Sequence, residues 1–217
     1  NMKSMRYGLW IAAIAAFLSG CGCLTAAAAG SSWKPAGPDG GDARRFAFSA
    51  QDPARIYVGT IDSWIYVSND GGSSWSRLAH LGQQDNLVID SLVVDRSDPR
   101  TLYAGVWVMD HPDGGLYISH DEGRSWSEAQ DMHGQSVRSL TQARSNPRVL
   151  VAGTLHGVYR TEDGGRHWRE ISPAGSTEIH EVESIAIDPY DAQTIYAGTW
   201  HLPWRTMDGG AHWSNIK

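Results

Sequence analysis

The 217-residue sequence predicts an all-β protein built from repeated four-stranded units, and three observations lead to this fold class. Three short sequence elements recur together four times, at a period of about 45 residues. Glycine and tryptophan are abundant, at 24 and 10 residues, whereas phenylalanine occurs only 3 times. Short apolar runs that end at glycine or at turn residues take the place of long helical patterns.

The overall composition excludes several classes of protein. Charged residues make up 19% and hydrophobic residues 41% of the chain, which argues against a disordered tail or a membrane bundle. The net charge is −6, and the basic residues form no block. We therefore expect no nucleic-acid partner.

The first thirty residues are typical of a bacterial export signal. Two basic residues, Lys3 and Arg6, precede an apolar run from Tyr7 to Leu18, which is too short to span a bilayer as a helix. We interpret residues 1–30 as a secretory signal and residues 31–217 as the exported domain. The mature protein is then expected in the periplasm or at the cell surface.

Two fates are open for the end of this signal. The run Leu18-Ser19-Gly20-Cys21 resembles a lipobox, in which Cys21 is lipidated and attaches the protein to a membrane surface. The alternative is simple cleavage within Ala26–Ala29, which gives a secreted protein. Since Cys21 and Cys23 are the only cysteines, residues 31–217 contain no disulfide.

Each repeat begins with a turn and a buried strand. The turn is Asp52-Pro53 in the first copy, because proline fixes φ and an aspartate or asparagine side chain bonds its own backbone. Its counterparts are Asp98-Pro99, Asn146-Pro147 and Asp191-Ala192. An apolar run ending at glycine follows, such as 56–59, and it predicts a buried strand.

A second strand and a hairpin complete the repeat. The run 64–67 predicts the next strand, and an aspartate hairpin follows it. The aspartate accepts backbone N–H groups, the glycines take φ > 0, and the tryptophan packs as an anchor. The residues assigned to these four hairpins are Asp70, Gly72, Trp75, Asp121, Gly123, Trp126, Asp163, Gly165, Trp168, Asp208, Gly210 and Trp213.

Two further strands fill the remaining length of each repeat. A polar strand follows each tryptophan, and an apolar run such as 91–94 precedes the next turn. Four strands in about 45 residues are typical of one blade of a β-propeller.

The hairpin motif Ser/Thr-x-Asp-x-Gly-x-x-Trp resembles the Asp-box, or BNR repeat, of sialidase-like β-propellers. The preceding Tyr-Ala-Gly-Thr strand resembles the photosystem II assembly-factor-like, sortilin-type and xyloglucanase-type branches. The resemblance covers residues 31–217 and implies the fold. It does not settle the function, because members include hydrolases, binding proteins and assembly factors.

The resemblance also implies a larger ring. The resemblance implies a ring of six to eight blades, as is usual for Asp-box proteins, so we expect the four visible repeats to be part of a truncated propeller. A complete four-bladed ring is the alternative.

The resemblance implies that the ligand site lies on the rim opposite the aspartate hairpins. Loops between the second and third strands, and loops between blades, form this rim. Polar and aromatic residues gather there, which suits a shallow binding surface. The binding candidates are Asp62, Trp107, Asp110, His111, Asp113, His133, His156, His180, Glu181, Trp200 and His201.

Within this rim, the loop 106–115 is the strongest single candidate, because it is longer than its counterpart around Asp62. Trp204 aligns with strand tyrosines and is interpreted as a packing residue. Arg160 and Arg205 lie at equivalent positions, where they either bind an anion or, more commonly for such residues, are simply exposed.

No metal, cofactor or catalytic residue is assigned. The hairpin aspartates are interpreted as caps of their own turns, and no two histidines have the spacing H-x-x-x-H. A glycoside hydrolase needs two carboxylates facing each other across a cleft, and the sequence does not bring two together.

Three functions remain open. We favour a non-catalytic propeller that binds a protein or glycan partner. The first alternative is a glycoside hydrolase of the xyloglucanase or sialidase type, with part of its site beyond Lys217. The second alternative is an assembly factor for a membrane protein complex.

Overall fold

The computed structural model describes residues 36–38 and 42–216. In this part of the chain all regular structure is β-strand except one 3-10 helix, η1 (Gln130–Met132). The described residues form one compact unit. No helix of the described part has the length and apolarity needed to cross a membrane. The proposed signal 1–30 and Cys21 lie outside the described residues.

The described strands form four antiparallel sheets of four strands each. The first sheet contains β1 (Ala43–Phe48), β2 (Ile56–Thr60), β3 (Trp64–Ser68) and β4 (Ser76–His80). The second contains β5 (Leu87–Val94), β6 (Leu102–Val108), β7 (Gly114–Ser119) and β8 (Ser127–Glu128). The third contains β9 (Val137–Gln142), β10 (Leu150–Thr154), β11 (Val158–Thr161) and β12 (Arg169–Glu170). The fourth contains β13 (Ser184–Ile187), β14 (Ile195–Gly198), β15 (Pro203–Thr206) and β16 (Ser214–Asn215).

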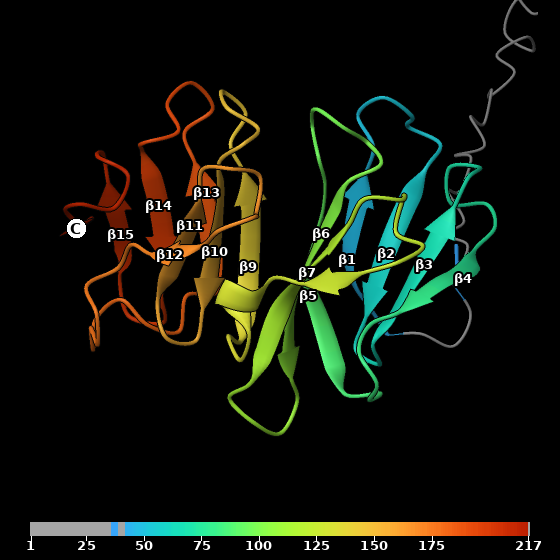
Figure 1. Cartoon of the computed structure of the whole chain (residues 1–217), viewed down its shortest axis with the longest axis horizontal. Coiled ribbons are helices and arrows are strands. Elements are labelled where there is room, and N and C mark those ends of the chain that lie inside the picture. The colour runs from blue at the N-terminus through green and yellow to red at the C-terminus, as the bar shows by residue number, and fades with distance from the viewer. Residues whose placement is uncertain (1–35, 39–41, 217) are drawn as a thin grey trace, which may run out of the picture. The chain divides into compact units, whose positions relative to one another are not determined.

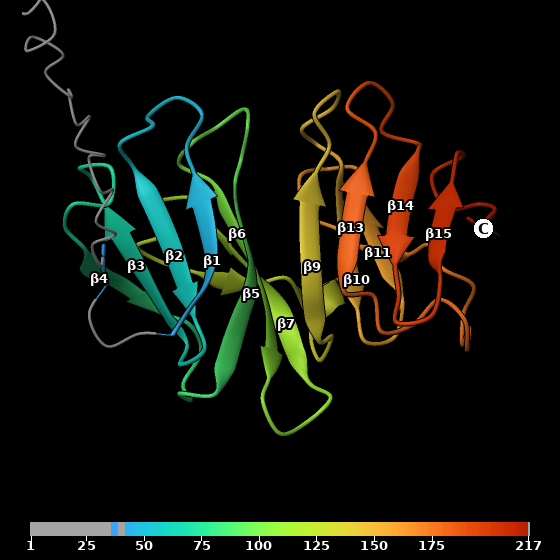
Figure 2. The same ribbon diagram turned by 180° about the vertical axis from the view of Figure 1, so that it is seen from behind.

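Each sheet is a simple up-and-down meander, and the sheets follow one another in chain order (Figures 1 and 2). The first strands lie against one another, β1 against β5, β5 against β9, and β9 against β13. Stacked four-stranded meanders with adjacent first strands are the arrangement of β-propeller blades. The predicted all-β propeller fold is therefore confirmed.

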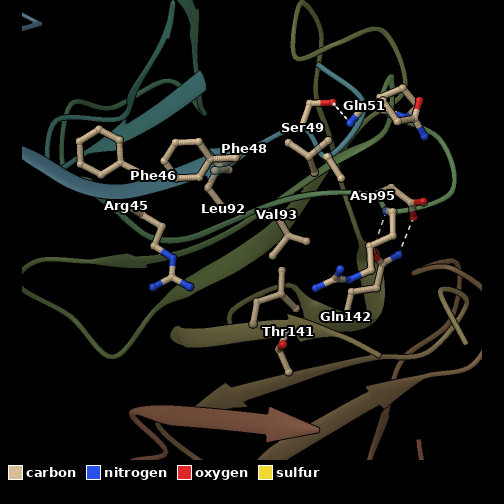
Figure 3. A pocket seen from close by; sticks show the side chains of 16 residues that line it. Arg45, Phe46, Phe48, Ser49, Gln51, Leu92, Val93, Asp95, Thr141 and Gln142 are labelled. Carbon is tan, nitrogen blue, oxygen red and sulfur yellow. Dashed lines mark hydrogen bonds between the residues drawn. The ribbon is translucent and has the colours of Figure 1, made fainter. Parts of the chain in front are cut away.

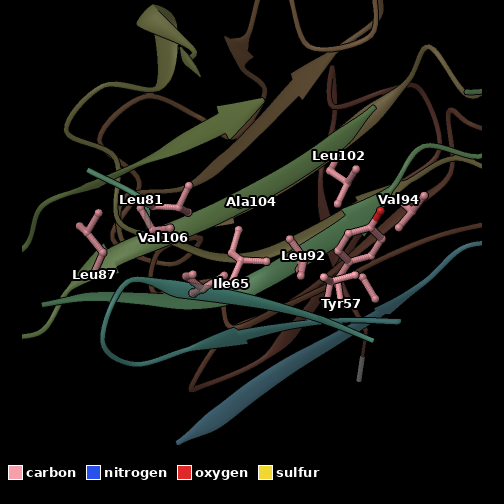
Figure 4. Close-up of a cluster of buried hydrophobic side chains, with 12 residues drawn as sticks. Tyr57, Ile65, Leu81, Leu87, Leu92, Val94, Leu102, Ala104 and Val106 are labelled. Carbon is pink, nitrogen blue, oxygen red and sulfur yellow. The ribbon is translucent and has the colours of Figure 1, made fainter. Parts of the chain in front are cut away.

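The hydrophobic core lies between the sheets, in three successive clusters. Between the first two sheets, Tyr57 and Ile65 of one sheet pack against Leu92, Ala104 and Val106 of the next (Figure 4). Neither sheet has a core of its own, since alternate residues of each strand face opposite neighbours. Burial of apolar area thus depends on contact between repeats.

A glycine in the second strand of each of the first three sheets marks a close approach to the next sheet. A Cβ atom added to Gly59 would lie 2.5 Å from Cγ2 of Ile89 on the next sheet, and one added to Gly153 would lie 2.7 Å from Cγ1 of Val182. Any side chain at these positions would push the next sheet away. The repeated glycine is therefore a packing requirement.

We expect Gly59→Ala to lower the free energy of unfolding by about 1–3 kcal/mol, as overpacking of a close-packed core does. Urea denaturation monitored by tryptophan fluorescence measures this change. The matched control is Gly115→Ala on β7, where the new Cβ would meet Oε1 of Glu128, the movable end of a flexible side chain. Equal losses in both variants would contradict the packing role.

The four aspartate hairpins, which connect the third and fourth strands of each sheet, share a core set of hydrogen bonds. In the first, Ser68 Oγ donates to Asp70 Oδ1 at 2.7 Å and accepts from the Gly72 N–H at 2.8 Å. The Ser74 N–H and hydroxyl also donate to the Asp70 carboxylate, at 2.8 and 2.5 Å. The carboxylate thus closes the turn within its own hairpin. Asp121 repeats all of these contacts. Asp163 and Asp208 keep the backbone and threonine bonds, but the ring of His167 or His212 takes the place of the second serine hydroxyl.

These hydrogen bonds lower the pKa of the hairpin carboxyl groups. The Ser74 hydroxyl and N–H, with Ser68, lower the pKa of Asp70 from 3.8 to about 2. The hydroxyl and N–H of Ser125 hold the pKa of Asp121 still lower. Each carboxylate is therefore ionised over the physiological range, where it can accept all of its donors.

The depressed pKa values predict a loss of stability in acid. A carboxyl group with a lowered folded-state pKa contributes its stability above the ordinary value of 3.8, and loses it as the pH falls towards 2. We expect Asp70→Asn to be less stable than the wild type at about pH 5, with the difference shrinking towards pH 2. Urea midpoints across this range measure it. The same substitution at Asp110, exposed on a rim loop, should leave the profile unchanged.

Polar side chains also connect one sheet to the hairpin of the next. The Tyr103 hydroxyl lies 3.1 Å from both the Gly164 carbonyl oxygen and Asp95 Oδ2. Arg160 Nη1 donates to the Gly209 carbonyl at 3.2 Å. The interpretation of Arg160 as an exposed or anion-binding side chain is wrong, because it is only 1% exposed and bridges two sheets. Trp204 is buried, at 8% exposure, in the third core cluster.

Candidate functional site

The rim loops lie at the opposite end of the strands from the aspartate hairpins, since successive strands run antiparallel. These loops connect the second and third strands of a sheet, or one sheet and the next. The predicted candidates on them occupy separate parts of the rim. Two groups of them meet in shallow hollows, and the others stand apart.

The β6–β7 loop is shorter than predicted. Trp107 belongs to β6 and pairs with Val88 and Gly114, so the irregular part is confined to 109–113. Asp110 and His111 are exposed on this loop. The prediction missed the strand extension because Gly114 and Gly115 look like turn residues but pair in β7.

One hollow brings Asp113 and His133 together. It has a volume of about 220 Å³ and is lined also by Gln84, Tyr117 and Glu128. His133 Nδ1 lies 2.8 Å from Glu128 Oε1. This hydrogen bond, with the charge of Glu128, raises the pKa of His133. The hollow therefore combines amide, carboxylate and imidazole groups.

A second hollow, of about 490 Å³, brings together His156, His180 and Glu181 with Glu170. The β10–β11 turn and the long β12–β13 connection form its walls. Glu181 has φ of 51°, in the left-handed region, and its N–H donates to the Leu155 carbonyl at 2.8 Å. This bond ties the two loops together beneath the hollow.

The remaining predicted residues do not join either hollow. Asp62 lies in the short β2–β3 turn, where its Oδ1 accepts the Thr60 hydroxyl at 2.5 Å. Trp200 and His201 lie on the β14–β15 loop, and Trp200 is 74% exposed. The exposed Trp200 ring offers a flat aromatic face on which a ligand ring can stack.

A charged row that the sequence analysis missed lies on the first strands. We call Arg44, Asp90, Arg138 and Glu183 the charged row. Arg44 in β1, Asp90 in β5 and Arg138 in β9 have no paired residue on the second strand of their sheet. Each is therefore the extra residue of a β-bulge. Glu183 precedes β13 and donates its N–H to the Gly198 carbonyl. Bulges re-aim side chains and occur often beside active sites.

Contacts along the row connect three sheets. Arg44 donates from Nε and Nη2 to Asp90 Oδ1, at 2.9 and 2.6 Å. Trp107 Nε1 donates to Asp90 Oδ2. The Arg138 guanidinium carbon lies 3.9 Å from the centroid of the Trp107 ring. The predicted rim residue Trp107 is therefore held between a carboxylate and a guanidinium.

A sequence signal for the row does exist. Its members precede the repeat turns at Asp52, Asp98, Asn146 and Asp191 by the same number of residues. The charges alternate as Arg, Asp, Arg and Glu. An in-register comparison of the apolar strands, in addition to the hairpins, would have found it.

Another hollow, of about 270 Å³, lies along β1, β5 and β9 (Figure 3). Arg45, Arg96 and Phe48 line it, and Phe48 is 60% exposed. Asp95 is buried there, which opposes its ionisation, but hydrogen bonds from Ser97, Asp98 and Gln142 hold its pKa below the ordinary value. Asp95 therefore serves the turn and the sheet contact.

Within the described residues, no three histidine, cysteine, aspartate or glutamate side chains gather as metal ligands. The expectation of no metal and no cofactor stays a prediction, as do the individual binding residues.

Two curated proteins show what the chain resembles by sequence. A probable oligoxyloglucan-reducing end-specific xyloglucanase of Neosartorya fischeri is 32% identical over 118 residues, 53% of this chain and 14% of that protein. A Paenibacillus xyloglucanase is 28% identical over 172 residues, 60% of this chain and 16% of that protein. The chain thus spans about a seventh of the length of these relatives. No family model matches the chain.

Solved structures agree on the fold. An ancestral GH74 enzyme superposes with a TM-score of 0.70 at 20% identity, covering 87% of this chain and 26% of that one. The protein YCF48 bound to a D1 peptide superposes with a TM-score of 0.58 at 16% identity, covering 82% and 53%. At these identities the likeness shows a β-propeller and nothing finer. The assembly-factor alternative gains only this shared fold.

The sequence matches overturn one expectation. We expected a non-catalytic protein, whereas the curated relatives with the broadest matches are enzymes named as xyloglucanases. The error arose because the sequence alone brought no two carboxylates together. The glycoside hydrolase alternative accounts for the matches better.

The contacts of Asp90 predict its effect on stability. Its side chain is 14% exposed and accepts from Arg44 and Trp107. We expect Asp90→Ala to lower the free energy of unfolding by about 1–3 kcal/mol, because a part-buried indole N–H loses its acceptor. Urea denaturation measures this. Asp85→Ala is the control, since that carboxylate is 85% exposed in a surface pair with His80, and equal losses would contradict the role of the row.

Proposed function

We propose that this chain is part of a glycoside hydrolase that acts on a branched polysaccharide of the xyloglucan class. The sequence similarity to xyloglucanases over more than half of the chain carries the proposal. The repeats are then Asp-boxes of a sialidase-like propeller, with the hairpins as structural caps. A polysaccharide substrate outside the cell agrees with export through the signal at residues 1–30.

The rim offers the chemistry that a polysaccharide needs. Trp200 is exposed and offers an aromatic face for stacking on a sugar ring. His133, Glu128, His180 and Glu181 line the two hollows with groups that bind hydroxyls. The openness of these hollows suits a long chain that lies across several loops.

Hydrolysis of a glycosidic bond requires two carboxyl groups, one of which acts as a general acid. We propose Asp62 as one member of such a pair. It lies at the rim on a turn of only three residues, and the Thr60 hydroxyl fixes its carboxylate. Asp90 is less suitable, because Arg44 and Trp107 already occupy its oxygens.

Release of reducing ends from xyloglucan by the whole protein to which this chain belongs tests the proposal, with an unbranched β-glucan as the comparison polymer. We expect preferential cleavage of xyloglucan, and a loss of about 10²–10⁴-fold in rate for Asp62→Asn, the usual range for removal of an acid–base group. Asp52→Asn is the matched control, because Asp52 lies at the hairpin end of the same sheet. Absence of cleavage and of binding to xyloglucan would contradict the proposal.

A further inference from the structure

A strained backbone position lies directly beside Asp62, the carboxylate proposed above for hydrolysis. Ser63 has a φ of 67°, in the left-handed region, where residues other than glycine are uncommon. The equivalent turns of the third and fourth sheets, after Thr154 and Thr199, contain no residue with positive φ. Strained residues persist only where the surrounding structure holds them, and they cluster at functional sites. The strain at Ser63 is therefore held by its contacts.

Four hydrogen bonds connect Ser63 to the segment 81–87, which joins the first sheet to the second. Its N–H donates to the Leu87 carbonyl at 3.0 Å, and its carbonyl accepts from the Leu81 N–H at 2.9 Å. Its hydroxyl donates to the Gln84 carbonyl at 2.6 Å and accepts from the Leu87 N–H at 3.0 Å. The residue is fully buried. Every polar group of Ser63 is thus bound, and the turn is tied to the neighbouring segment.

The Thr60 hydroxyl does not hold Asp62 by itself. It lies 2.5 Å from Asp62 Oδ1 and 2.8 Å from the Trp64 carbonyl oxygen, but it has only one hydrogen to donate. It also accepts from the Trp64 N–H at 3.1 Å. The carboxylate keeps this hydrogen only while the turn holds it at the shorter distance. The position of Asp62 relative to Thr60 therefore depends on the backbone that follows it, which is Ser63.

We propose that Ser63 is a positioning residue for the Asp62 carboxylate. Its four hydrogen bonds fix a backbone conformation that a serine would otherwise avoid, and this conformation holds Asp62 beside the Thr60 hydroxyl at the rim. An acid–base group acts only from the correct position, and a displacement of about 1 Å can cost about 10²-fold in rate. The expected effect on rate rests on the proposed hydrolase function, whereas the effect on geometry does not.

Two substitutions in the whole protein to which this chain belongs test the role of Ser63. Ser63→Ala removes the hydroxyl and keeps the strain, whereas Ser63→Gly removes both, because glycine adopts positive φ freely. The glycine variant therefore remains testable even where the alanine variant does not fold. Ser68→Ala is the matched control, since Ser68 is also buried on the first sheet and its hydroxyl also makes several hydrogen bonds, but at the hairpin end.

The kcat and KM for xyloglucan are measured for each variant, together with a crystal structure. We expect both Ser63 variants to lower kcat by about 10²-fold with KM unchanged, and to lose the hydrogen bond between Thr60 and Asp62. Ser68→Ala should lower the urea midpoint and leave both kcat and this hydrogen bond as in the wild type.

A wild-type kcat in either Ser63 variant would overturn the proposal, and so would an equal fall of kcat in Ser68→Ala. A wild type that does not cleave xyloglucan would reject the hydrolase function instead. The crystal structures then decide the role of Ser63 alone: loss of the hydrogen bond between Thr60 and Asp62 in the Ser63 variants supports it, and retention of that bond overturns it.

Discussion

Close packing between consecutive sheets is the constraint on which the structure depends. Each sheet has two largely apolar faces, and neither can be buried within the repeat itself. Tyr57 and Ile65 are fully buried because the second sheet covers them. A glycine in the second strand of each of the first three sheets permits this approach, because Ile89, Val137 or Val182 of the next sheet occupies the space that a Cβ would need. Stability is therefore shared between neighbours.

Polar interactions organise around that packing. Each hairpin satisfies its own N–H groups with a carboxylate and a hydroxyl, and in the third and fourth hairpins the carbonyl after the aspartate is directed at the preceding sheet. Tyr103 and Arg160 use this carbonyl, so the same turn closes a hairpin and aligns two sheets. A buried arginine is tolerated because Gly209 and Gln193 accept from it. The hairpin end is thus committed to structure, which leaves the opposite rim available for function.

The rim loops differ from sheet to sheet, whereas the hairpins at the opposite end are alike. The loops differ in length and composition, and they form two hollows with different side chains. The charged row lies at the rim ends of the first strands, where bulges direct arginine and acidic residues away from the regular pairing. A regular scaffold with one variable face accommodates different ligands without a change of fold.

The sequence by itself determined the repeat, the strand order and the hairpins, because turn residues and glycines act through local backbone geometry. It also placed Asp62, His133 and Trp200 on one rim, since antiparallel strands separate the two ends. Only the tertiary structure decided which rim residues meet, because Asp113 and His133 come from different loops. It alone showed that Arg160 is buried and that Asp90 lies between Arg44 and Trp107. These contacts join separate repeats, and their distances depend on how the sheets pack, which no local pattern encodes.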